Sequence, residues 1–446
     1  MRIIGTIVLV LIILAVGVGG FLGYRLFEGN SPVITPVQVP VLLGEKNRIV
    51  IKVQDEGTGI SLITAEIIQE GKAHPVASEQ FPRISYLTGT GIESREVEWQ
   101  VMPKELGLKQ GRALLRITAR DASFRNGMSG NVAVAQAEIN IDTKPPVITV
   151  LSSVHNVRVG GAAATSFRID EDVKRCGIRV DDTFFPAFKG KDGIWRAIWG
   201  IRYDKDRPAR IVVEALDMAG NLAAAGFNYR VLARKKVRDR INISDGFLRA
   251  KMPDFVSRYP ELAGKSQIET FLKVNRELRR RNNDFLLSLT SNSVPEVLWS
   301  GRFKRFAGAP KAGFADERHY FYKGKEVDQA FHMGVDIASV ARAKVPAANS
   351  GRVVFAGYNG IYGNTVVIDH GLGLMSLYAH LSSIAVNEGD QVSKGQVIGR
   401  TGTTGLAGGD HLHFGLMASS IFINPVEWWD SRWIETHMVP NLLLSR

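Results

Sequence analysis

The sequence contains a single cysteine, Cys176, among its 446 residues. One cysteine excludes an intramolecular disulfide, and it also excludes a zinc site built on cysteine sulfur. Any metal site must therefore use histidine and carboxylate ligands, and Cys176 is expected to be a small buried apolar residue. The chain also lacks a His-Glu-x-x-His motif and any nucleic-acid-binding motif. A net charge of +12 is compatible with nucleic acid, an anionic lipid or an acidic polymer such as a bacterial wall, and most of these charges are expected to be a solvated surface. Because no nucleic-acid-binding motif is present, we predict no nucleic-acid partner.

The N-terminal segment has no charged residue from Ile3 to Tyr24. This is about the 20 residues that a membrane-spanning helix needs. A cleaved signal peptide is the alternative, with small residues near Gly17 available for cleavage. The apolar run continues past them, which favours an uncleaved transmembrane anchor over residues 1–28. We therefore predict a single-pass protein of the inner (cytoplasmic) membrane, with the bulk of the chain in the periplasm or extracytoplasmic space.

Two strand-rich segments follow, over residues 31–143 and 145–232, and Pro145 and Pro146 stand between them. Each segment contains an Asp-Glu pair near its start and an Asp followed by Gly-Asn near its end. Short strands with frequent turns are typical of β-sandwiches. The two segments resemble the immunoglobulin-like (Ig-like) modules of bacterial surface proteins. This resemblance implies two β-sandwich modules that act as a spacer or bind the cell wall.

Residues 233–293 change to a helical pattern, which predicts a helical linker. Ser266 is followed three residues later by Glu269, a capping box that marks the start of a helix. Pro253 predicts at least two helices rather than one, because proline disrupts a helix interior. We expect these helices to be packing elements. The alternative is that residues 266–289, or the loop near Phe314, cover a functional groove.

Seven of the nine histidines lie at or after His319, so the last third of the chain is where a metal site is expected. His332 and Asp336 flank Gly334, and the neighbouring residues argue against a helix. We expect the chain to turn at Gly334 and enter a strand, so that both side chains can converge. Imidazole nitrogen and carboxylate oxygen are suitable zinc donors.

His411 and His413 form a second histidine motif, and on a strand both would point to the same face because the side-chain period is two. One of the two could bind a metal while the other acts on substrate or water. His380 follows a mostly apolar run and has no local partner, so local reasoning alone makes it a weak candidate.

Residues 311–429 resemble the LytM and lysostaphin-like zinc endopeptidases of peptidase family M23. The matching residues are His332 to Asp336, Tyr362-Gly363-Asn364, Tyr378 to Leu381, Val392, Lys394 to Gln396, Ile398, Gly399, Gly402, Thr404, Gly405, His411 and His413. The resemblance implies an antiparallel β-sheet peptidase domain, which we place at residues 294–435. It also implies that His332, Asp336 and His413 bind Zn²⁺ and that His380 and His411 are catalytic. His319, His370 and His437 match no role of the family.

The implied chemistry is the attack of a zinc-activated water on a peptide carbonyl. Three protein ligands leave a fourth position for water, whose pKa zinc lowers to about 7. His380 or His411 would take the proton of the water, or stabilise the oxyanion and protonate the leaving amine. The sequence leaves open which histidine has which role.

Three positions depart from the family pattern. Asp410 stands where proline usually precedes the histidine pair, and Gly415 stands where glutamate usually follows Phe414. Ala315 follows Phe314 where relatives often have glycine. None is a predicted ligand, so these departures concern loop geometry and substrate preference rather than metal binding.

The sequence thus predicts a mainly β protein with a transmembrane helix, two Ig-like modules, a helical linker and a peptidase domain. The leading functional prediction is a membrane-anchored zinc metalloendopeptidase that hydrolyses peptide cross-links of bacterial peptidoglycan. A non-catalytic regulator or activator of other wall hydrolases, with envelope proteins as partners, is the alternative. A structural envelope protein is the third hypothesis.

Overall fold

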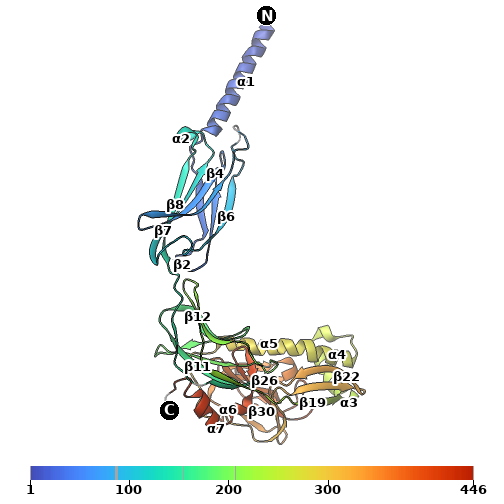
Figure 1. The fold of residues 1–446 in the computed structure, drawn as a ribbon. Coiled ribbons are helices and arrows are strands. Elements are labelled where there is room, and N and C mark those ends of the chain that lie inside the picture. Colours follow the sequence, from blue (N-terminus) through green and yellow to red (C-terminus); the bar gives the residue numbers. More distant parts are fainter. Residues whose placement is uncertain (1, 86–88, 154, 206, 445–446) are drawn as a thin grey trace. The chain divides into compact units, whose positions relative to one another are not determined.

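The computed structural model describes residues 2–85, 89–153, 155–205 and 207–444. The fold is mainly β, as predicted, with an apolar helix at the N-terminus and a helical segment before the last third (Figure 1). The chain divides into two compact units. The first unit contains Met1–Pro146, Asp172–Lys174 and Leu216–Leu222, and the second contains Val147–Glu171, Arg175–Ala215 and Ala223–Arg446.

Helix α1 (Arg2–Leu26) begins the first unit. Its stretch from Ile4 to Leu26 is long and apolar enough to cross a membrane, and none of the most apolar window is buried within the protein. Such a helix is compatible with either an anchor or a signal sequence.

The strands of the first unit form two sheets around a shared core. Their bounds are β1 (Val33–Gln38), β2 (Leu42–Leu43), β3 (Asn47–Gln54), β4 (Ile60–Gln69), β5 (Lys72–Gln80), β6 (Ser94–Val101), β7 (Gly111–Asp121) and β8 (Val132–Ile141), and the short helix α2 is Arg125–Met128. The sheet orders are β1-β3-β6 and β2-β8-β7-β4-β5. Ile49, Ile51 and Val53 of β3 alternate along the strand and belong to this core, and Val50 between them is buried as well. The Ig-like identity of this arrangement stays a prediction.

Further short strands follow along the chain, and most of their residues belong to the second unit. They are β9 (Ile148–Val150), β10 (His155–Arg158), β11 (Ala162–Ile169), β12 (Val173–Val180), β13 (Thr183–Pro186), β14 (Phe188–Lys189), β15 (Trp195–Gly200), β16 (Ile211–Asp217), β17 (Leu222–Ala225) and β18 (Tyr229–Leu232). They form sheets with the orders β14-β15-β11-β9 and β13-β12-β16-β17, and β10 pairs with β18 in parallel.

The helical segment consists of α3 (Asp245–Arg258), α4 (Gln267–Lys273), a π-helical turn η2 (Val274–Leu278) and α5 (Arg279–Leu289), with single 3₁₀ turns η1 (Pro260–Leu262) and η3 (Thr290–Asn292). The capping box is confirmed: the Ser266 hydroxyl accepts the Glu269 N–H, and the Glu269 carboxylate accepts the Ser266 N–H. The region contains more than one helix, as predicted, but Pro253 is not where they divide: it lies inside α3, and α3 and α4 separate at residues 259–266.

A strand stands at the start of the region predicted to be helical. Residues Arg238–Ile243 form β19, which pairs in parallel with β21 (Glu317–Tyr322). This pairing joins residues some 80 positions apart, and tertiary contacts of this kind override local helical preference. The helical segment is thereby tied to the histidine-rich region.

The histidine-rich region is built from strands and short helical turns. They are β20 (Ala309–Ala312), β22 (Lys325–Phe331), β23 (Val335–Ala338), β24 (Lys344–Pro346), β25 (Gly351–Tyr358), η4 (Gly360–Tyr362), β26 (Asn364–Asp369), β27 (Leu374–Leu381), β28 (Ser383–Ile384), β29 (Gln391–Val392), β30 (Val397–Arg400), β31 (Leu412–Ala418), β32 (Ile421–Ile423), α6 (Pro425–Trp428), α7 (Ser431–Trp433) and η5 (Ile434–Met438). The main sheet has the order β20-β23-β31-β27-β26-β25-β29, with β32 beside β31. Every residue of β27 and β31 is buried, so the sheet is a rigid platform for side chains at its surface.

Candidate metal centre and its groove

Strand register brings two of the predicted ligands side by side. Strand β23 runs antiparallel to β31, and Asp336 is the direct partner of His413. On the other side of β31, His413 faces Ala379 of β27, the residue before His380. Directly paired residues on neighbouring strands have Cβ atoms about 4.5–5.5 Å apart. Three adjacent strands therefore hold Asp336 and His413 in one row with Ala379, and His380 directly follows Ala379.

His332 reaches the same point from the turn before β23. The His332 N–H donates to Asp316 O at 3.0 Å, and the His332 carbonyl accepts the Ala315 N–H at 2.7 Å. Its side-chain Nδ1 lies 2.8 Å from Gly313 O. The expected turn at Gly334, followed by a strand, is present. The backbone of residues 313–316 fixes both the chain and the ring of His332.

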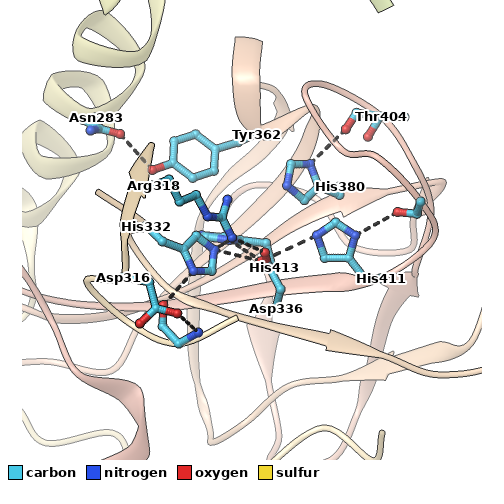
Figure 2. Close-up of polar contacts among 12 residues, drawn as sticks. Asn283, Asp316, Arg318, His332, Asp336, Tyr362, His380, Thr404, His411 and His413 are labelled. Atoms are coloured by element: carbon cyan, nitrogen blue, oxygen red, sulfur yellow. Dashed lines mark hydrogen bonds and ion pairs between the residues drawn. The ribbon is translucent and has the colours of Figure 1, made fainter. Parts of the chain in front are cut away.

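The three predicted ligands converge on one point (Figure 2). His332 Nε2 and His413 Nδ1 each lie 2.9 Å from Asp336 Oδ1, and the two nitrogens lie 3.0 Å from each other. All three residues are at least nine-tenths buried. Residues separated by up to 81 positions in the chain thus place three donor atoms within one coordination sphere.

The protonation states suit a cation. Burial lowers the pKa of His332 and brings that of His413 to about 4, so both rings are neutral at pH 7. Burial alone would raise the pKa of Asp336, but His332, His411 and His413 hold it well below its usual range. Neutral imidazoles beside an ionised carboxylate form the donor set that a divalent metal requires.

The hydrogen-bond pattern also fits a metal. The Nδ1 of His332 faces the Gly313 carbonyl, so the neutral ring carries its proton there and directs the Nε2 lone pair at Asp336. A lone pair facing a carboxylate is repulsive unless a cation lies between them. His413 Nε2 is buried without a partner among the described residues, whereas its Nδ1 faces Asp336, so Nδ1 is the nitrogen of this ring that is placed to bind a metal. These residues therefore fit Zn²⁺.

His380 is aimed by a bulge in β27. Between Tyr378 and Leu381 this strand has one residue more than its partner β26, and His380 has a φ of +62°, in the left-handed region. Bulges re-aim a side chain out of the regular alternation. His380 Nδ1 donates to Thr404 O at 2.9 Å, which leaves the Nε2 lone pair of the neutral ring free. Burial and the neighbouring His411 and His413 keep the pKa of His380 well below its usual range.

His411 lies beside His380, with ring centroids 4.9 Å apart. It precedes β31 and forms an isolated bridge with Gly402. Its Nδ1 lies 2.8 Å from Gly409 O, and its Nε2 lies 3.5 Å from Asp336 Oδ1. Burial lowers the pKa of His411, but the hydrogen bond and the charge of Asp336 outweigh this and raise it. The structure thus brings all five predicted site residues together.

Arg318 is a site residue that the sequence did not indicate. It lies on β21, and its Nη2 donates to Asp336 Oδ2 at 2.8 Å while Oδ1 faces the two histidines (Figure 2). The guanidinium thus orients the carboxylate, the role that outer partners of metal ligands play. Arg318 precedes the ligand motif by 14 residues, and no local pattern marks it.

The candidate metal centre opens into a cavity of about 340 Å³. One wall carries Asp336, His380, His411 and the loop Leu406–Gly408. The other wall comes from β19, the helical segment and β21, and it consists of Ile241, Asn242, Ile243, Phe247, Phe271, Arg279, Arg318 and Tyr320. The helical segment therefore contributes to the groove, whereas Phe314 does not line it. Phe314 is buried and packs against Tyr203 at a ring distance of 6.0 Å.

The remaining histidines of this region have structural contacts elsewhere. His370 is fully buried between Ser350 O and Ser376 Oγ, His319 contacts Glu326, and His437 stacks on Trp433. Asp410 accepts the Arg342 N–H and has no histidine partner among the described residues. Cys176 is buried, as expected.

Comparison with known proteins gives the family of this region. Residues 330–425 match the sequence profile described as Peptidase family M23. The chain is 42% identical to the DD-carboxypeptidase/endopeptidase Mpg of Neisseria meningitidis over 95 residues, and this stretch covers 21% of this chain and 22% of that protein. It is 40% identical over 96 residues to the peptidoglycan DD-endopeptidase ShyA of Vibrio cholerae, 22% of either chain. It is also 37% identical over 95 residues to the murein hydrolase activator EnvC of Escherichia coli, 21% of this chain and 23% of that protein.

The chain thus spans about a fifth of the length of the curated relatives that it matches. The shared stretch contains the three converging donors and the two further histidines, whereas Arg318 and the helical wall of the groove lie outside it. The C-terminal region of this protein, over residues 330–425, is a peptidase domain of family M23.

Proposed function

We propose that this protein is a zinc metalloendopeptidase that hydrolyses peptide cross-links of bacterial peptidoglycan. His332, Asp336 and His413 are the proposed zinc ligands, and His380 and His411 are the proposed catalytic residues. The observation that carries the proposal is the convergence of three donor atoms within 3.0 Å of one another, beside two further histidines.

When bound, zinc would polarise the scissile carbonyl and lower the pKa of a water molecule. Proton transfer would be carried out by histidine side chains of the protein. His380 and His411 each face a backbone carbonyl with Nδ1, so in the neutral form of each ring Nε2 carries the free lone pair. Such a nitrogen can accept a proton from the attacking water and return it to the leaving amine. Arg318 orients the carboxylate of Asp336 toward His332 and His413.

The substrate class is supported by the names of two relatives, a peptidoglycan DD-endopeptidase and a DD-carboxypeptidase/endopeptidase. The exposed apolar helix α1 supports an uncleaved anchor in the cytoplasmic membrane, with the remaining chain in the periplasm or extracytoplasmic space. We further propose that residues 31–143 and 145–232 act as Ig-like spacers and residues 233–293 as a linker to a peptidase domain at residues 294–435.

The test uses the full chain purified in detergent and loaded with zinc. His332→Ala and Asp336→Ala should each lose stoichiometric zinc and the release of soluble peptides from purified wall. His437→Ala, which removes a histidine that stacks on Trp433, is the matched control and should retain both. Mass spectrometry of the products identifies the bond that is cleaved. Undiminished cleavage by the two ligand variants would falsify the proposal.

A non-catalytic activator of other wall hydrolases is the second candidate, and the relative described as a murein hydrolase activator favours it. Intact donor residues favour catalysis instead. Stoichiometric zinc without turnover of any cross-linked wall peptide, together with faster digestion by an added wall hydrolase, would establish the activator.

A further inference from the structure

Arg279 brings a positive charge into the groove from outside the matched peptidase region. It is the first residue of α5, and it lines the same cavity as Asp336, His380 and His411. It precedes the matched residues 330–425 by 51 positions. Its presence in the groove is therefore a property of this chain's helical segment.

The guanidinium of Arg279 is held on one side. Its Nη2 and Nε donate to Asn275 Oδ1 at 2.7 and 3.2 Å. Asn275 is only 2% exposed and donates in turn to Asp328 Oδ2 at 2.8 Å. Asn275 belongs to the π-helical turn η2, and π-turns inside helices occur frequently at functional sites. This chain of contacts positions Arg279, while its Nη1 has no partner among the described residues.

Arg279 also lacks a counter-charge among the described residues, unlike Arg276 and Arg281. Arg276 pairs with Asp328 at 2.9 Å, and Arg281 pairs with Glu261 at 3.0 Å. Within the described part of the chain, no carboxylate lies within 4.0 Å of the Arg279 guanidinium. A half-buried, unpaired charge is unfavourable for folding, so a positioned one suits the binding of an anion.

The cavity fits an anion that is part of a peptide. Arg318 supplies a second guanidinium, and Phe247, Phe271 and Tyr320 supply an apolar wall. Guanidinium groups bind carboxylates through two parallel hydrogen bonds, which gives geometric specificity as well as affinity. A cavity of about 340 Å³ holds a few residues of an extended chain rather than an isolated ion.

We propose that Arg279 binds a free carboxylate of the peptide substrate and selects peptides that carry one close to the scissile bond. This inference rests on the proposed peptidase function and adds the substrate feature that the groove recognises. A carboxylate at a chain end and one on a side chain would satisfy Arg279 equally.

The experiment compares wild type with Arg279→Gln on cross-linked peptide dimers from purified wall. One sample keeps all free carboxylates, and in another all are converted to amides. Arg279→Gln should raise KM for the free acid by roughly tenfold to a hundredfold, the worth of a hydrogen bond to a charged group, and leave kcat within about twofold. On the amide, both proteins should have the same high KM. Samples amidated only at chain ends or only at side chains show which carboxylate is bound.

Arg280→Gln is the matched control. The substitution removes the same charge from the adjacent position, where the side chain does not line this cavity. KM for both substrates should therefore stay at the wild-type value. Arg279→Lys retains the positive charge but cannot form the bidentate pair of hydrogen bonds, so its KM for the free acid should lie between those of wild type and Arg279→Gln. Thermal melting and zinc content should match wild type in all three variants. If Arg279→Gln does not fold, Arg279→Lys provides the comparison.

Binding to the zinc-free protein separates this inference from the proposed function. Calorimetry in the presence of a chelator should show the free-acid dimer binding wild type more tightly than Arg279→Gln, by the same factor as KM. A wild type that cleaves nothing would overturn the peptidase function and leave this comparison valid. Equal affinity of wild type for acid and amide, or an equal loss on both substrates in Arg279→Gln, would overturn the role of Arg279.

Discussion

Replacing Gly334 with alanine should disrupt the proposed metal centre without removing any of the proposed ligands. Gly334 lies between His332 and Asp336, and a Cβ there would stand 2.6 Å from His413 Nε2 and 2.6 Å from Phe414 O. Ordinary contacts of a Cβ begin near 3.4 Å, so these groups must separate by about 0.8 Å. Neither neighbour can yield alone, because the ring is buried and the carbonyl belongs to the sheet.

Both obstructing groups belong to β31, so the alanine pushes β23 away from β31. The next pair along these strands is Asp336 with His413, whose donor atoms lie 2.9 Å apart. Lengthening this contact by about 0.8 Å displaces Asp336 from the position in which its carboxylate faces both histidines, and so distorts the geometry in which the three donors could bind one ion. A displacement of about 1 Å typically reduces activity by about 100-fold, and we expect a similar loss in zinc affinity. Overpacking should also destabilise the zinc-free fold by about 1–3 kcal/mol.

The assay is competition for zinc with a chromophoric chelator, together with thermal melting of the zinc-free protein. Gly408→Ala is the matched control, because Gly408 lines the same cavity and a Cβ there meets no atom within 4 Å. Its zinc affinity should equal that of wild type. Zinc binding by Gly334→Ala within about threefold of wild type, or an equal loss in both variants, would refute the steric argument.

Two further predictions concern stability. Burial raises the pKa of the Glu427 carboxyl to about 7, although the Ala162 N–H and Arg158 oppose this shift. The protonated carboxyl therefore stabilises the fold fully below about pH 4.5, and this stabilisation is lost as pH rises through 7. Relative to Glu427→Gln, wild type should lose up to about 3 kcal/mol between pH 5 and pH 8 in urea unfolding, and an unchanged difference between the two proteins would contradict this. Ala315, whose N–H donates to the His332 carbonyl, has a φ of +59°, where glycine is unstrained. Ala315→Gly should therefore raise the free energy of unfolding by up to about 1 kcal/mol and keep the wild-type zinc affinity. A fall in the free energy of unfolding would show that the backbone is not strained there.

Local sequence patterns determined several features correctly. The capping box at Ser266 specifies a helix start because both partners lie within one turn of chain. The turn at Gly334 and the shared direction of His411 and His413 follow from short-range geometry, and both histidines approach Asp336. The apolar character of α1 is equally a property of consecutive residues.

Long-range pairing decided the rest. Strand register, which no local pattern specifies, places Asp336 beside His413. His380 acquires its direction from a bulge in β27, so its significance was visible in the sequence only through a family resemblance. Strand β19 forms within a region of helical pattern because β21 offers it a partner.

The groove contains both residues that the sequence could predict and residues that only the fold places there. His332, Asp336, His411 and His413 could be picked out as candidates because their residue types and spacing carry their chemistry, and His380 could be added because of the family resemblance. Arg318 and Arg279 could not, since an arginine has no distinguishing context until the fold sets it beside a carboxylate or an open cavity. Sequence determined which atoms could bind a metal, and tertiary structure alone decided which charges surround it.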